Sequence, residues 1–336
     1  MVTTAAAASL AVLVGMSISA SVAAAVHLNS RSPSPQAHSV YISLVSTALG
    51  TALLIVASLL VVRVPLVRPR RWWTLCGGVC VLPSFATVAA SGTVGVQASM
   101  VALLVGQLGT ALAIDTCIKR STRVTAWTLV GLGLVYGGVG VNAFAASSSA
   151  GVPRFTAASA LFLLLCALAG AGYALLALCV AELGKDIGSP LRATCLSGVV
   201  LILALLPLAA GTWLCGRLPP TLRPATDWPL WLFVGAQYGA YILAMALLPR
   251  VLSYTPLLIS SLIGQLVCST VVDATNLAGA VHVPLTWSRG VALALICCGY
   301  AVYQLAAAHS RVLPPAKDDD GAEVEEGGPV KAGVRN

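Results

Sequence analysis

Charged residues are scarce in this 336-residue sequence, where Asp, Glu, Lys and Arg together make up only 9%. Soluble domains carry about 25% charged residues, so this scarcity excludes an ordinary soluble protein. Apolar residues account for 58% of the chain, and the mean hydropathy is +0.92. The sequence therefore predicts an all-α membrane protein.

Motifs for catalysis and for cofactor binding are missing too. The four His residues fall in loops or at the ends of the expected helices, so none can act as a general base within the membrane. There is no GxxxxGK[ST] phosphate loop and no GxSxG motif. Most of the ten Cys residues lie in apolar stretches, where Cys behaves as a small apolar residue. We predict no enzyme activity, no metal site and no cofactor.

Long apolar runs are abundant, and they define the expected membrane spans. A helix needs about 20 apolar residues to cross a bilayer. Ten stretches of this kind occur at residues 5–26, 40–62, 72–91, 95–118, 124–146, 156–180, 193–215, 228–248, 252–274 and 287–307. The first stretch lacks the basic start of a signal peptide, so we interpret it as a retained helix.

Basic residues are distributed unequally between the two sets of loops. With a cytoplasmic amino terminus, the inner segments hold 14 Lys and Arg residues and the outer loops hold 5. Basic residues concentrate on the cytoplasmic side of membrane proteins, so we predict that both termini are cytoplasmic. This bias also explains the net charge of +8 without any binding of nucleic acid.

A repeat divides the chain into two halves. The segment GQLGTALAID at 106–115 returns 158 positions later as GQLVCSTVVD at 264–273. We predict one five-helix repeat at 1–150, a second at 151–310, and a disordered, acidic cytoplasmic tail at 311–336. Because five is odd, the second copy enters the membrane from the opposite side, which gives the inverted repeats of many transporters.

Polar residues within the repeated helix are the main candidates for a substrate or coupling site. Gln107 and Gln265 fall near mid-depth, whereas Asp115 and Asp273 fall near opposite ends of the membrane. An Asp at the bilayer centre costs about 2.5 to 3.5 kcal/mol and usually faces a bundle interior or a water-filled path. In a purely structural alternative, Asp115 caps its helix end and pairs with Lys119, and the two Gln tie helices together.

The eighth stretch adds two further candidates for the lining of a cavity, Gln237 and Tyr241. The equivalent positions of the third stretch hold Val79 and Pro83, so the two walls differ in polarity. Such a cavity favours a substrate with one polar and one apolar end. The aromatic residue could instead belong to the core or to the membrane interface.

The two copies of the Gly-Gln-Leu motif, each with an Asp eight residues after the Gln, resemble the YdcZ-like branch of the drug/metabolite transporter superfamily. The resemblance covers residues 5 to 307. It implies a bacterial inner-membrane carrier with ten helices in two inverted repeats, of the kind supposed to export small metabolites or drugs. One departure is that family members usually place His and a Phe-Gly pair after the Asp, where this chain has Thr116-Cys117 and Ala274-Thr275.

Together these features predict a secondary transporter that moves a small metabolite or drug-like molecule by alternating access. Efflux is favoured over uptake. Coupling to protons is a hypothesis that rests on the placement of Asp273. The expected partners are the substrate, the lipid bilayer and protons. The glycine-rich stretch at 124–146 predicts close helix packing, within one chain or across a homodimer. The alternative function is an integral membrane scaffold or assembly factor derived from a carrier fold.

Overall fold

The computed structural model describes residues 2–30, 35–62, 69–94, 96–119, 125–147, 157–215, 224–275 and 286–312. These residues form helices and contain no β-strand. The helices of the first half are α1 (Val2–Ser30), α2 (Pro35–Val61), α3 (Gly77–Cys80), α4 (Phe85–Val94), α5 (Val96–Ala113) and α6 (Ala126–Ser147). Those of the second half are α7 (Ala157–Asp186), α8 (Pro190–Leu214), α9 (Pro224–Leu247), α10 (Tyr254–Thr275) and α11 (Trp287–Val312).

The ten apolar stretches expected from the sequence all correspond to helical segments. Nine segments of the described chain are long and apolar enough to cross a membrane, and the tenth, α6, has an apolar helical part at Ala126–Val141. Because an α-helix rises 1.5 Å per residue, about 20 residues cover the 30 Å hydrocarbon core. The all-α membrane fold is therefore confirmed.

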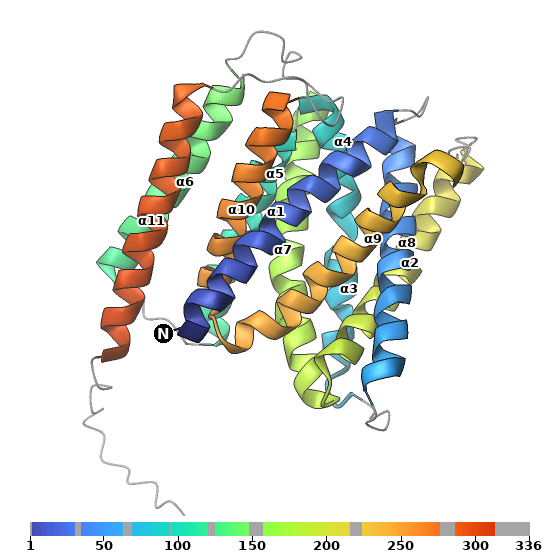
Figure 1. The fold of residues 1–336 in the computed structure, drawn as a ribbon, viewed down its shortest axis with the longest axis horizontal. Coiled ribbons are helices and arrows are strands. Elements are labelled where there is room, and N and C mark those ends of the chain that lie inside the picture. Colours follow the sequence, from blue (N-terminus) through green and yellow to red (C-terminus); the bar gives the residue numbers. More distant parts are fainter. Residues whose placement is uncertain are drawn as a thin grey trace, which may run out of the picture.

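The first and the last helix place their outer ends on the same side of the bundle, where α1 begins and α11 ends (Figure 1). This arrangement agrees with an even number of spans. The boundary expected at 150 lies outside the described residues. Most of the expected tail does too, since only Arg311 and Val312 of that segment are described, as the end of α11.

The third span differs from the single helix that hydropathy predicts. It consists of a 3₁₀ segment (Trp72–Cys76), α3, a second 3₁₀ turn (Leu82–Ser84) and α4. Pro83 sits in this second turn, and proline has no N–H to donate and disfavours an unbroken helix. The equivalent position in the second half is Tyr241, and α9 continues through it without a break.

The two halves are interleaved, because the closest helix pairs join one half to the other. Helix α1 packs against α10, α5 against α7, and α2 against α8 and α9. Helices α6 and α11 form a pair at one edge of the bundle (Figure 1). Because helices of the two halves pack against each other in this way, helices from both halves surround the centre of the bundle.

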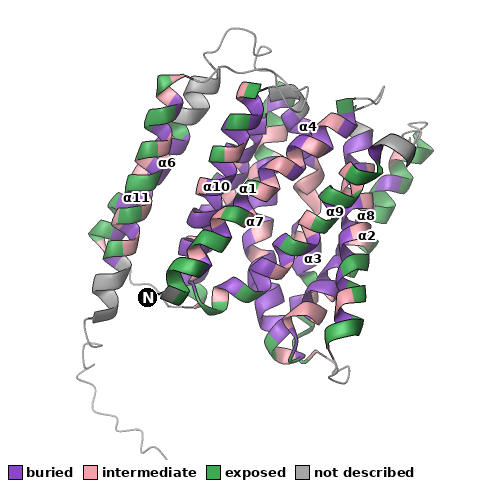
Figure 2. Cartoon of the chain, in the orientation of Figure 1, coloured by how far each residue is buried: buried purple, intermediate pink, exposed green. Residues whose placement is uncertain are grey.

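The outer surface of the bundle is apolar, as a lipid-facing surface must be. Buried residues concentrate on the faces that helices turn toward each other, and exposed residues follow the outer faces (Figure 2). The exposed side chains include Leu59, Leu60, Leu203, Leu214 and Trp287. These positions fit a chain embedded in a bilayer.

Candidate functional site

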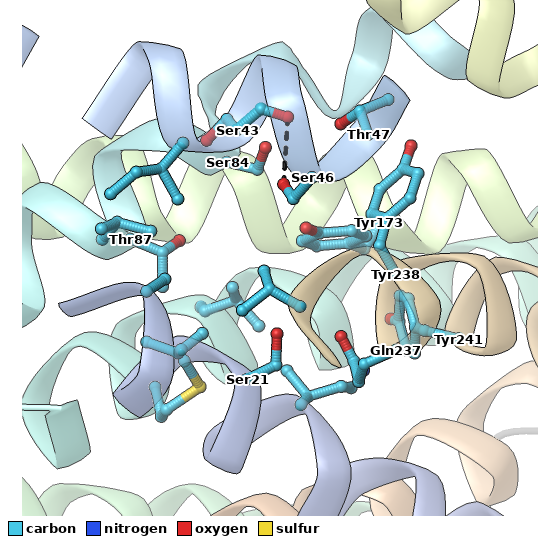
Figure 3. Close-up of a pocket in the computed structure, with 18 of the residues that line it drawn as sticks. Ser21, Ser43, Ser46, Thr47, Ser84, Thr87, Tyr173, Gln237, Tyr238 and Tyr241 are labelled. Carbon is cyan, nitrogen blue, oxygen red and sulfur yellow. Dashed lines mark hydrogen bonds between the residues drawn. The ribbon is translucent and has the colours of Figure 1, made fainter. Parts of the chain in front are cut away.

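A cavity of about 90 Å³ lies between α1, α2, α4, α5, α7, α9 and α10. Figure 3 shows Ser21 and Gln237 on one side of this space, across from Ser46 and Ser84. None of the described residues that line the cavity is Asp, Glu, Lys, Arg or His. Its polar lining residues are Ser21, Ser43, Ser46, Thr47, Ser84, Thr87, Gln107, Tyr173, Gln237, Tyr238, Tyr241 and Gln265.

The glycine of each Gly-Gln-Leu motif marks a point where two helices nearly touch. A Cβ atom on Gly106 would lie 1.8 Å from the backbone oxygen of Ala167 on α7, and one on Gly264 would lie 2.0 Å from that of Val12 on α1. Only glycine permits such an approach, which is typical of small residues at membrane helix crossings. The crossing fixes each helix so that the following Gln lines the cavity.

Both Gln side chains are almost completely buried, with 1% of Gln107 and none of Gln265 exposed. The Nε2 atom of Gln107 donates to Tyr241 Oη at 3.3 Å, and Nε2 of Gln265 donates to Ser261 Oγ at 3.1 Å. Neither Oε1 atom has a hydrogen-bond partner within the described part of the chain. Two amide acceptors at the cavity are therefore available to a ligand.

Gln237 and Tyr241 contribute the wall formed by α9. Gln237 lines the cavity, and its Nε2 atom has no hydrogen-bond partner among the residues described. Tyr241 packs edge-on against Tyr173 of α7, with ring centroids 5.3 Å apart and an interplanar angle of 84°. Sequence reasoning did not single out Tyr173, since nothing in a single apolar helix indicates which of its faces meets a cavity.

Asp115 and Asp273 do not line this cavity. They cap helices of the opposite repeat instead. Asp115 follows α5 in a π-helical turn (Ile114–Ile118), and it accepts the backbone N–H groups of Tyr254 at 3.2 Å and Thr255 at 2.7 Å. These two groups belong to the first turn of α10, whose N–H groups have no partner within the helix.

Asp273 makes the reciprocal contact near the other end of α10. Its Oδ2 atom accepts the backbone N–H of Gln97 at 3.2 Å, in the first turn of α5. A carboxylate at a helix N-terminus is stabilised by unpaired N–H groups and by the helix dipole. Each motif helix therefore ends in an Asp that caps the start of the other.

Both Asp residues have a basic side chain nearby. Asp273 interacts electrostatically with Arg289, which is fully buried near the start of α11. Asp115 and Lys119 line a second cavity of about 400 Å³, together with Lys185 and Arg250. This second cavity is charged, in contrast to the first.

Glu182 is a buried acidic residue whose role the sequence did not reveal, because the expected span ended at residue 180. Its carboxylate binds Arg71 at 3.1 Å and Lys185 at 3.0 Å, and it also contacts Lys119. These contacts link the start of the third span, the end of α5 and α7. The structural alternative for Asp115 paired it with Lys119, whereas the structure gives Lys119 an ion pair with Glu182.

Comparison with known proteins bears on the family and the fold of the chain. The family described as "Putative inner membrane exporter, YdcZ" matches residues 6–141 and again residues 161–302. No curated protein sequence matches the chain. One solved crystal structure resembles it with a TM-score of 0.62 at 17% identity, covering 92% of this chain and 99% of that chain. At this identity the likeness establishes the fold alone.

The family match covers both repeats and most of the chain. It agrees with the resemblance carried by the repeated motif and with the apolar helices of the described segments. The chain belongs to the YdcZ family of inner membrane exporters and is a multi-pass inner membrane protein of the drug/metabolite transporter type.

Proposed function

We propose that this protein is a secondary carrier that exports a small molecule by alternating access. The cavity shared by the two halves would hold the substrate, and Gln107, Gln265, Gln237 and Tyr241 would contact it. The observation that carries this proposal is that two equivalent buried Gln, one from each repeat, line a single cavity. Inverted-repeat carriers place their substrate where the repeats meet.

The reciprocal caps would serve as two latches at opposite ends of the membrane. Alternating access requires one end of the path to open while the other stays closed. Asp115 holds the start of α10 at one end, and Asp273 holds the start of α5 at the other. Both of these contacts are formed in the structure. With both termini in the cytoplasm, the Asp115 latch would lie at the cytoplasmic end.

Asp273 would couple transport to protons. Its Oδ1 atom has no hydrogen-bond partner among the described residues, whereas both oxygens of Asp115 accept backbone N–H groups. A proton can therefore bind to Oδ1 of Asp273 without replacing the bond to α5. Protonation would also remove the negative charge that strengthens the bond to Gln97 and attracts Arg289, and so would weaken that latch without breaking its bond.

The test is transport by purified protein in proteoliposomes, with internal pH recorded by a trapped dye while a panel of small metabolites is added. For the wild type we expect a solute-dependent proton flux. Asp273→Asn should abolish the response to an imposed pH gradient and keep solute exchange, whereas Asp115→Asn should slow both. An unchanged response in Asp273→Asn would reject the coupling role. A wild type that moves no solute would favour the scaffold alternative.

A further inference from the structure

We propose that the central cavity selects small uncharged molecules that carry amide or hydroxyl groups, and that it rejects ions. This inference rests on the proposed role of the cavity as the substrate site. It is carried by three properties of the cavity, namely its charge, its unpaired polar atoms and its size.

Charge is the first property. The lining side chains are hydroxyl-bearing, amide-bearing, aliphatic and aromatic, and none of them is ionised at neutral pH. An ion that leaves water for a buried site needs an opposite charge there to offset its lost hydration. The carboxylates of the two motif helices, Asp115 and Asp273, are engaged at helix starts outside the lining. A neutral solute avoids this penalty, so the cavity favours it over a charged one of the same size.

The unpaired polar atoms define the pattern of hydrogen bonds that a ligand must offer. Gln107 and Gln265 each present an amide oxygen, and Gln237 presents an amide nitrogen, none of which has a partner in the described segments. Leaving buried polar atoms unpaired costs free energy. A ligand with at least two donors and one acceptor would pair all three, which a carboxamide or a polyol can do.

The size and shape of the cavity further restrict the class of ligand that it can hold. A volume of about 90 Å³ accommodates roughly six to nine water-sized groups. The aromatic rings of Tyr173, Tyr238 and Tyr241 lie beside the hydroxyl and amide side chains that line the cavity (Figure 3). Flat or compact molecules with one polar edge and one apolar face fit this combination. Small aromatic and aliphatic carboxamides have this form.

The experiment compares carboxamides with carboxylates of nearly the same shape. Nicotinamide and nicotinate, benzamide and benzoate, and lactamide and lactate are each titrated into the full-length protein in lipid nanodiscs, and binding is measured by equilibrium dialysis. We expect the amide of a pair to bind at least about tenfold more tightly than the acid, which corresponds to about 1.4 kcal/mol.

Variants of cavity residues test whether the amides bind in this cavity. Gln107→Leu and Gln265→Leu should each weaken amide binding about tenfold. Leucine is well tolerated in a membrane helix, so both proteins should fold, and size-exclusion chromatography checks this. Gln304→Leu is the matched control, because Gln304 lies on α11 and bonds Tyr300 outside the cavity lining. Its affinity should equal that of the wild type.

Because binding is measured at equilibrium, this inference and the carrier proposal fail separately. Equal or tighter binding of the acids would overturn the selection for neutral molecules, as would no amide binding at millimolar concentration. Amide binding that the Gln variants leave unchanged would overturn its assignment to this cavity. Amide binding without transport in proteoliposomes would uphold the inference and reject the carrier function.

Discussion

Helices α5 and α10 carry the same motif, yet they differ at the Asp that ends it. Asp115 lies in a π-helical turn and both of its oxygens accept backbone N–H groups. Asp273 lies in a regular α-helix and leaves Oδ1 without a hydrogen bond among the described residues. The Gly and Gln of the two copies keep equivalent positions. The repeat has thus kept its Gly-Gln half and changed the surroundings of its Asp, and the proposed proton response of one latch rests on this difference.

The third segments of the two halves differ in a second way. The first half interrupts its helix at Pro83, and Ser84 next to it faces the cavity. The second half keeps its helix and places Tyr241 at the equivalent position. One wall therefore supplies a hydroxyl from a backbone turn, and the other supplies an aromatic ring. An inverted repeat can build an asymmetric binding site by this means.

The largest effect is expected where the two motif helices are most alike. Gly106→Val places a branched side chain where a Cβ would lie 1.8 Å from the oxygen of Ala167, so α5 and α7 must separate. Overpacking of this kind costs about 3 kcal/mol or more. We expect little monodisperse protein by size-exclusion chromatography, and the same result for Gly264→Val.

Gly109→Ala is the control on the same helix. A Cβ at this position would meet only Tyr136 Oη, at 3.4 Å. The equivalent residue of the second copy is Val267, so the fold already accepts a side chain there. Normal yield of Gly106→Val would show that the crossing does not need glycine.

The second prediction concerns stability at the two latches. In Asp115→Asn one of two accepted bonds is lost and an amide group faces a backbone N–H, so the free energy of unfolding should fall by about 2 kcal/mol. In Asp273→Asn the remaining oxygen can keep its bond to Gln97, and the loss should be about 1 kcal/mol. Thermal unfolding in detergent measures both. The reverse order would mean that the electrostatic attraction to Arg289 outweighs the helix cap.

The smallest effect is expected within the cavity. Tyr241→Phe removes the acceptor for Gln107 Nε2 and keeps the ring packed against Tyr173. Loss of one neutral hydrogen bond is worth about 1 kcal/mol, so the transport KM should rise roughly fivefold. Tyr300→Phe, which changes a hydroxyl outside the lining, should leave KM unchanged. Equal values for both variants would remove Tyr241 from the site.

The sequence predicted the spans and the repeat well because both are encoded locally. Hydropathy depends on neighbouring residues, and a duplicated motif is visible in a single chain. The depth expected for Gln107 and Gln265 in the membrane stays a prediction. The sequence did not predict the partners of Asp115, which lie 139 and 140 positions away. The ion pairs of Glu182 and the orientation of Tyr173 toward the cavity also depend on helices that are distant in the sequence. No local sequence pattern specifies such contacts.

The interleaved pairing of α1 with α10 and of α5 with α7 also sets the order in which the protein can be completed. Chains are synthesised from the amino terminus, at about 5 to 20 residues per second. When α5 enters the bilayer, the helix start that Asp115 will cap has not yet been made. The first five spans must therefore wait with an open groove, and α10 closes it late in synthesis. Two half-length chains produced together should assemble in the same way, because the grooves of each half are filled by the other.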